Sequence, residues 1–202
     1  MPFEMFWATP VYWSLFDEDE EALKKIDVEV SSSMEKYEED LNRPWDDKML
    51  TSFHPNWMKE YPEKGRYNTF LQSCPLLESY VKKHTNFFLD FFSLHKNFNE
   101  FDITESWFNK GSKFSYQNYH KHAGSDISGC YYHQTNEQDG NITFRTDSTG
   151  LRMSKLYPYD DITYKPAKGK IILFPSFLEH CVLMNSTDGE RISISFNINL
   201  MT

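Results

Sequence analysis

The sequence predicts an α+β protein that is mainly β, with a double-stranded β-helix (jelly-roll) core and N-terminal helices packed outside it. Helix-forming residues concentrate in residues 17–104, whereas from residue 105 apolar residues alternate along short segments separated by turn residues. Aromatic residues make up 17% of the 202 residues, which is enough bulk for a large core. We expect one domain over residues 1–202. Residues 1–104 would supply an N-terminal strand and a helical support layer, and residues 105–202 the jelly roll.

The N-terminal half predicts one strand and two helices around a loop. The aromatic start, residues 1–17, lacks the basic region of a signal peptide and predicts a strand that enters the core. Residues 20–40 fit an amphipathic helix, and residues 74–95 fit a longer, more buried helix with Pro75 in its first turn. The proline-containing residues 42–65 between them predict a loop.

The C-terminal half predicts an antiparallel double sheet. Turn residues, such as those around Gly124, Gly140 and Gly189, divide it into short segments. Many short strands at this spacing are typical of a sandwich or barrel. The expected strands are 105–111, 114–122, 127–134, 140–146, 168–176, 179–185 and 191–200.

The composition argues against several partners. A formal net charge of −9 disfavours a broad electrostatic contact with nucleic acid, which needs clustered Lys and Arg. The three cysteines, Cys74, Cys130 and Cys181, form no C-x-x-C pair and predict a reducing compartment rather than a disulfide framework. No apolar run approaches the length of a membrane span. We therefore expect a cytoplasmic protein without membrane contact, and a homodimer is compatible with the sequence.

Two histidines one residue apart suggest a metal site. On a strand, His120 and His122 would point to the same face, and two imidazoles could then converge on one ion. His180, which follows the apolar strand and bend of "KGKIILFPSFLEH", is the best candidate for a third ligand, and Asp126 is another. Three imidazoles would bind Fe(II), Zn(II) or Ni(II), whereas two imidazoles and a carboxylate are typical of non-haem Fe(II).

A cation and a hydroxyl share one face of the last predicted strand. In "ERISISFNINL", alternation puts Arg191, Ser193, Ser195 and Asn197 on one face and the apolar residues on the other. The guanidinium of Arg191 can hold a carboxylate through two hydrogen bonds, and the Ser193 hydroxyl can add a third. A metal near such a carboxylate site implies a ligand with two acidic or chelating ends.

At this point the sequence resembles a known family. Residues 105–199 are similar to a bacterial and phage group of 2-oxoglutarate- and Fe(II)-dependent oxygenases related to prolyl hydroxylases. The matching motifs, in order, are Trp107-Phe108-Asn109, Gln117-Asn118-Tyr119-His120-Lys121-His122, Ser128-Gly129-Cys130-Tyr131-Tyr132, Gly140, Phe174-Pro175-Ser176 with His180, and Arg191-Ile192-Ser193-Ile194-Ser195-Phe196-Asn197.

The resemblance implies roles for individual residues. His120 and His180 would bind iron, and His122 falls where related hydroxylases carry the carboxylate of H-x-D. His122 or Asp126 would then complete the ligand set. Arg191, Ser193 and Tyr132 would bind the distal carboxylate of 2-oxoglutarate.

The resemblance also implies a reaction. The enzyme would be a dioxygenase that uses O2 and 2-oxoglutarate to hydroxylate a C–H bond, with succinate and CO2 as co-products. The substrate would be a protein or a small molecule, and the prolyl-hydroxylase likeness points to a peptidyl, prolyl-type substrate. The compartment would be a bacterial cytoplasm, or that of an infected host cell for a viral protein.

Two other functions are compatible with the same residues. A cupin-like metal enzyme or metal-binding protein would use the histidines without 2-oxoglutarate, and a non-catalytic jelly-roll binding protein would hold no iron. Loss of 2-oxoglutarate binding in Arg191→Ala separates the first interpretation from the cupin-like one.

Overall fold

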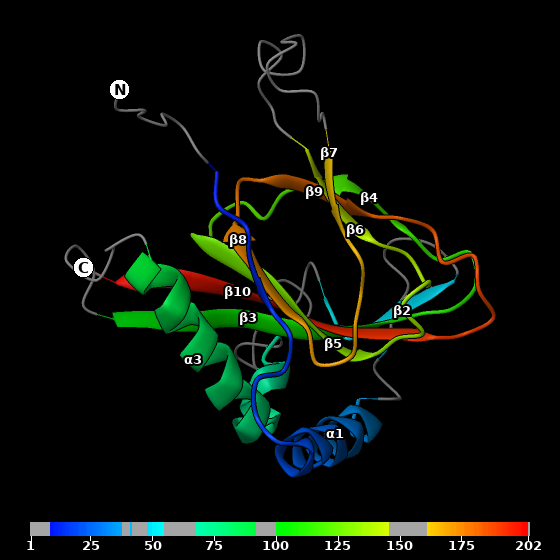
Figure 1. Cartoon of the computed structure of the whole chain (residues 1–202), viewed down its shortest axis with the longest axis horizontal. Helices are drawn as coiled ribbons and strands as arrows, with labels where there is room; N and C mark the ends of the chain where they lie inside the picture. The colour runs from blue at the N-terminus through cyan, green and yellow to red at the C-terminus, as the bar shows by residue number, and fades with distance from the viewer. Residues whose placement is uncertain are drawn as a thin grey trace, which may run out of the picture.

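The computed structural model of the protein describes residues 9–37, 41, 48–54, 68–91, 100–145 and 161–201. Two antiparallel sheets face each other, as expected for a jelly roll. The larger sheet has the strand order β1-β8-β5-β10-β3-β2, and the smaller one β4-β9-β6-β7. Figure 1 shows the smaller sheet on one side of the larger sheet and the helices on the other.

The strands have the following bounds. Those of the larger sheet are β1 (Tyr12–Ser14), β2 (Met49–Thr51), β3 (Glu100–Gly111), β5 (Ile127–Gln134), β8 (Ile171–Pro175) and β10 (Arg191–Met201). Those of the smaller sheet are β4 (Gln117–His120), β6 (Ile142–Arg145), β7 (Asp161–Tyr164) and β9 (Glu179–Val182).

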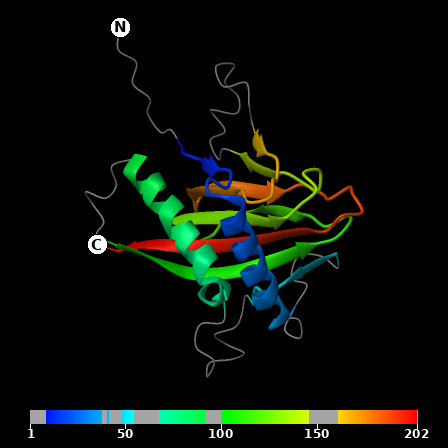
Figure 2. The same cartoon turned by 60° about the horizontal axis from the view of Figure 1, so that its bottom comes forward.

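Two helices cover the outer face of the larger sheet, where Figure 2 shows them crossing its strands. The first, α1 (Glu20–Glu35), begins where Asp19 accepts a hydrogen bond from the Ala22 N–H at 2.8 Å. The second, α3 (Pro75–Phe91), begins at the expected proline. The Glu29 carboxylate of α1 accepts hydrogen bonds from the first free N–H groups of α3, so one helix caps the other. Neither described helix has the length and apolar content that crossing a membrane requires.

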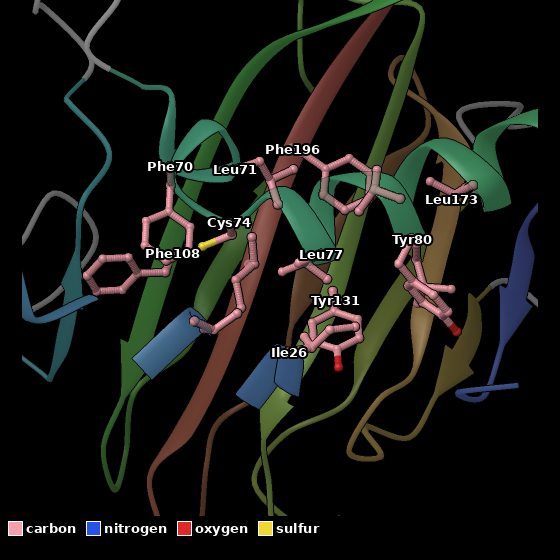
Figure 3. Close-up of a cluster of buried hydrophobic side chains, with 14 of the residues drawn as sticks. Ile26, Phe70, Leu71, Cys74, Leu77, Tyr80, Phe108, Tyr131, Leu173 and Phe196 are labelled. Atoms are coloured by element: carbon pink, nitrogen blue, oxygen red, sulfur yellow. The ribbon is translucent and has the colours of Figure 1, made fainter. Parts of the chain in front are cut away.

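The core lies between these helices and the larger sheet. Alternate residues of β10 point into it, and they are fully or almost fully buried: Ile192, Ile194, Phe196 and Ile198. Figure 3 shows Phe196, Leu71, Leu77, Tyr131 of β5 and Ile26 of α1 in one buried cluster. Burial of this much apolar surface is the main stabilising contribution to the fold.

The predicted elements differ from the observed ones in places. Residues 42–65 were expected to be a loop, but Met49–Thr51 form β2 against the end of β3. The strand β7 was not expected, and β3 begins five residues earlier than predicted. The predicted parts 38–40 and 92–95 of the two helices, and residues 1–8, 42–47 and 55–65, lie outside the described residues.

Candidate metal centre and cofactor pocket

Three histidines converge between the two sheets. His120 is the last residue of β4 and pairs in register with His180 of β9, and their ring centroids are 4.3 Å apart. His122 lies two residues beyond the end of β4, with its ring 5.3 Å from that of His120 and 5.1 Å from that of His180. One ring nitrogen from each lies within 4.8 Å of the other two. Three ligand nitrogens at this spacing can surround one metal ion.

His122 reaches the group by a different route from the predicted one. The pair was expected on one continuous strand, but β4 ends at His120. The backbone N–H of His122 donates to the Ser176 carbonyl at 3.0 Å, just after β8. This contact holds the segment beyond β4 against the larger sheet and turns the His122 ring towards the other two histidines.

The hydrogen bonds of His120 and His180 fix which ring nitrogen carries the proton. The Nδ1–H of His120 donates to the Asn118 carbonyl at 2.7 Å, and that of His180 to the Leu178 carbonyl at 2.9 Å. A carbonyl oxygen only accepts, so Nδ1 carries the proton and Nε2 keeps its lone pair. Both rings are therefore in the form that binds a metal through Nε2.

His122 is held by side chains instead. Its Nδ1 lies 2.6 Å from Oδ1 of Asn197 on β10 and 3.1 Å from the Ser128 hydroxyl on β5. The ring of Trp107 lies over it at a centroid distance of 5.8 Å. The position of the ring therefore depends on residues of three strands of the larger sheet.

Burial keeps the three imidazoles neutral. It lowers the pKa of His120 and of His122 from the usual value, and together with the neighbouring His120 it lowers the pKa of His180 to about 3. Neutral imidazole is the form that binds metal, so the metal-free site at neutral pH is ready for an ion without releasing protons.

Asp126, the alternative ligand, lies elsewhere. Its Oδ2 accepts a hydrogen bond from the Leu200 N–H at 2.8 Å, and it is not part of the three-histidine group. No Asp or Glu among the described residues joins that group. The candidate centre therefore consists of imidazoles alone, a set that suits Fe(II), Ni(II) or Zn(II).

The same pocket holds a buried cation. Arg191 at the start of β10 is 4% exposed, and its Nη1 donates to the carbonyls of Asp139 and Gly140. None of the ion pairs formed between described residues includes Arg191. Because a buried charge is costly without a partner of opposite sign, the pocket favours a carboxylate ligand at this end.

The other two residues predicted to bind 2-oxoglutarate line the same pocket as Arg191. Ser193 pairs in register with Tyr132 of β5, and both side chains face the pocket. The pocket is lined by polar and apolar side chains together, namely Trp107, Gln117, His120, His122, Gly129, Cys130, Tyr132, Ile142, Phe174, His180, Val182, Arg191, Ser193 and Ser195. It thus offers a cation with two hydroxyl groups and a cluster of metal-binding nitrogens in one cavity, as an α-keto diacid requires.

Sequence reasoning gave no role to three residues that hold the site together. Ser128 and Asn197 were recognised only as members of motifs, and Glu105 was not singled out. Asn197 pairs in register with Ser128 on one side and Glu105 on the other, so the three side chains form a row across the sheet. The alternation of β10, which puts Asn197 on the same face as Arg191, was the available signal.

A family model matches the C-terminal part of the chain. Residues 105–197, a little under half of the chain, match the family model described as "Putative 2OG-Fe(II) oxygenase". The match begins at Glu105 and ends at Asn197, so it contains all six predicted site residues. None of the curated proteins that were compared matches the chain.

Solved structures of low sequence identity share the fold. A prolyl-4-hydroxylase from Pseudomonas putida aligns over 95% of this chain and 92% of its own, with 12% identity and a TM-score of 0.57. The viral collagen prolyl hydroxylase of Paramecium Bursaria Chlorella virus-1, solved with 2-oxoglutarate, aligns over 95% and 96%, with 13% identity and a TM-score of 0.53. HygX from Streptomyces hygroscopicus, with nickel and 2-oxoglutarate bound, aligns over 95% and 83%, with 11% identity and a TM-score of 0.55.

These findings bear out the expected fold, cofactors and reaction class. The sheets, the family match and the composition of the pocket agree on an enzyme that uses Fe(II), 2-oxoglutarate and O2. Residues 105–197 therefore match the sequence pattern of the 2-oxoglutarate- and Fe(II)-dependent oxygenases.

Proposed function

We propose that His120, His122 and His180 hold Fe(II), and that Arg191, Ser193 and Tyr132 bind the distal carboxylate of 2-oxoglutarate. One observation carries this assignment. Three imidazoles with nitrogens within 4.8 Å of one another share a pocket with a buried arginine. When bound, Fe(II) and 2-oxoglutarate supply the oxidising chemistry, in which O2 yields succinate, CO2 and a hydroxylated C–H bond.

The protein residues would bind and orient the metal and 2-oxoglutarate, and they would exclude water from the pocket. The Nδ1–H bonds of His120 and His180 to carbonyl groups hold both rings with Nε2 towards the centre. Arg191 is fixed by two carbonyls, so its guanidinium is preorganised for a carboxylate. Phe174 and Ile142 line the pocket with apolar surface, which strengthens the electrostatic attraction between Arg191 and its ligand.

An anaerobic titration tests the assignment. Fe(II) and 2-oxoglutarate added together to the metal-free protein should produce a weak visible charge-transfer band, and admission of air should yield succinate. Neither should occur when 2-oxoglutarate is left out. A wild-type protein that gives neither band nor succinate contradicts the assignment.

A peptidyl, prolyl-type substrate is a finer proposal. Its support is the resemblance of residues 105–199 to the prolyl-hydroxylase-related group. The fold does not choose a substrate, because the solved structures that share it include HygX, which has also been solved with hygromycin B. Proline-rich peptides should accelerate 2-oxoglutarate turnover. Each hydroxylated peptide should gain one oxygen atom, which raises its mass by about 16 Da. Acceleration by small molecules alone would overturn this proposal.

The proposal includes the setting of the enzyme. The net charge of −9 disfavours nucleic acid as a substrate. Three buried, free cysteines support a reducing, cytoplasmic compartment. A homodimer stays a prediction, and sedimentation measurements would test it.

A further inference from the structure

One row of side chains links a carboxylate to the candidate metal centre. Glu105 of β3, Asn197 of β10 and Ser128 of β5 are neighbours in register across the larger sheet. Residues paired in this way point to the same face and lie close enough to interact. Asn197 is 4% exposed and Ser128 is fully buried, so the row is enclosed where it meets His122.

We propose that Glu105 and Asn197 are positioning residues for His122: they fix its ring so that Nε2 faces the metal, and they place a carboxylate two hydrogen bonds away from that ring. The inference rests on the proposed role of His122 as a metal ligand. It assigns to Glu105 a part of the work that a directly bound carboxylate does in the commoner two-histidine site.

The direction of each hydrogen bond follows from the carboxylate. Glu105 Oε2 accepts only, so the Asn197 atom 2.9 Å from it must be the Nδ2 amino group. The Asn197 oxygen, Oδ1, therefore faces the other way. There it accepts from the Ser128 hydroxyl at 2.8 Å and from Nδ1 of His122 at 2.6 Å.

This chain of donors and acceptors sets the tautomer of His122. Because Oδ1 of Asn197 accepts, Nδ1 of His122 must carry the proton, and Nε2 keeps the lone pair that a metal needs. If the amide of Asn197 were reversed, it would present N–H groups to Nδ1, and the proton would move to Nε2. Glu105 prevents that reversal without contacting the histidine.

His122 needs such a device, whereas the other two histidines do not. His120 and His180 each donate Nδ1–H to the carbonyl two residues earlier in the chain, so the backbone holds them. His122 lies beyond the end of β4 and is held by a side chain from the opposite sheet. The third ligand position is therefore the one that depends on distant residues.

The Glu105 carboxylate also brings a negative charge close to the candidate metal centre. A site of two histidines and a carboxylate places one negative charge on the metal, whereas three neutral imidazoles place none. The Glu105 carboxylate polarises the Asn197 amide, which in turn makes the His122 ring a stronger donor of electron density to the metal. Carboxylates that act on a metal through its histidine ligand are a known arrangement, and here an amide lies between the two.

Four variants test the proposal. Glu105→Gln keeps the size of the side chain but removes its charge, and the Asn197 amide is then no longer held in one orientation. Asn197→Asp brings a second carboxylate against Glu105. The double variant Glu105→Gln with Asn197→Asp moves a single carboxylate one step closer to His122. Glu100→Gln, an exposed acid on the same strand, is the matched control.

The first readout needs no metal. Long-range proton–nitrogen NMR spectra of the metal-free protein report which nitrogen of His122 carries the proton. Wild type, Glu100→Gln and the double variant should show the proton on Nδ1, and Glu105→Gln should show a mixture of the two tautomers. An unmixed Nδ1–H form in Glu105→Gln would overturn the proposed role of Glu105.

The second readout is calorimetric titration with Ni(II) alone. Glu105→Gln and Asn197→Asp should each bind Ni(II) about tenfold more weakly than wild type, within the range known for residues behind a metal ligand. The double variant should recover wild-type affinity. If both single variants bind like wild type, or if the double variant is as weak as they are, positioning through Asn197 is wrong.

The two readouts separate this inference from the proposed function. If wild type bound no Ni(II), the three-histidine metal site would be wrong. The NMR comparison of wild type and Glu105→Gln would still decide whether Glu105 sets the tautomer of His122, because that measurement involves no metal.

Discussion

His120 and His180 pair in register at one end of β4 and β9, with their ring centroids 4.3 Å apart. Each donates its Nδ1–H to the carbonyl two residues before it. The local backbone thus orients two candidate ligands, and the sheet pairing brings them together. Replacement of either histidine should therefore weaken metal binding without unfolding the protein.

We predict that His180→Gln lowers Ni(II) affinity by more than the roughly 10- to 100-fold that residues behind a ligand contribute. Isothermal calorimetry on the metal-free protein measures it. His133→Gln is the matched control, because His133 is also buried but contacts Asp27 and Ser31 instead of the pocket. Similar Ni(II) affinity in the two variants would contradict the assignment of His180.

Restoring the commoner motif with His122→Asp should not improve metal binding. The new carboxylate would face Oδ1 of Asn197, and two acceptors repel each other. We expect weaker Ni(II) binding than wild type and partial recovery when Glu105→Gln allows the Asn197 amide to reverse. A double-mutant cycle of the binding free energies measures this coupling. Additive effects would show that residues 105 and 122 act independently.

Arg191→Gln should remove 2-oxoglutarate binding and leave Ni(II) binding within a few-fold of wild type. The reason is that Arg191 is the buried cation of the pocket, whereas the metal is proposed to lie on the three histidines. Titration of the Ni(II) form with 2-oxoglutarate measures the effect. Arg145→Gln, which removes an arginine paired with Glu179, is the matched control. Unchanged 2-oxoglutarate affinity in Arg191→Gln would refute its role.

The metal-free protein should lose stability as the pH falls from about 6.5 towards 3. The pKa of His180 is near 6.5 in the unfolded chain and about 3 in the folded protein. Between these values the unfolded state binds one more proton, so the free energy of unfolding decreases by up to about 1.4 kcal/mol per pH unit.

Denaturant unfolding at several pH values measures this dependence. His180→Gln should show a shallower decrease than wild type over the same range, since it lacks the titrating ring. The same slope in both proteins would mean that His180 is not responsible. Saturating Ni(II) should also stabilise wild type at neutral pH, because the ion binds the folded state.

Gly129→Ala should destabilise the fold. Gly129 faces the ring of Phe196, and an added Cβ would lie 2.5 Å from that ring and 2.7 Å from the Ile172 carbonyl. Overpacking of this kind costs about 1–3 kcal/mol. Thermal unfolding measures it. An unchanged midpoint would show that β5 and β10 can separate at this point without cost.

Much of the fold could be predicted from the sequence because turn residues separate the strands and alternation marks the half-buried ones. The strand β5 was predicted with its observed bounds, since turn residues enclose a segment that is almost wholly buried. By contrast, β7 is mostly exposed, so alternation gave no signal there, and β2 has only three residues. A strand of that length exists because of its partner β3, which the local sequence does not encode.

The candidate site divides in the same way. His120, His180 and Arg191 belong to motifs of adjacent residues, so their sequence alone suggested them. The contact between Glu105 and Asn197 spans 92 positions and depends on how β3 and β10 align. Register between distant strands is a property of the packed sheet, and only the structure reveals it.

The two faces of β10 have a consequence for how such a protein can change over evolutionary time. Every second residue, from Ile192 to Ile198, belongs to the core, whereas Ser193 and Ser195 line the pocket and Asn197 contacts His122. Because the side-chain period of a strand is two, loss or gain of one residue within β10 would exchange the two sets. A change in chain length that keeps the two sets on their own faces can therefore occur only in the turns at the ends of β10.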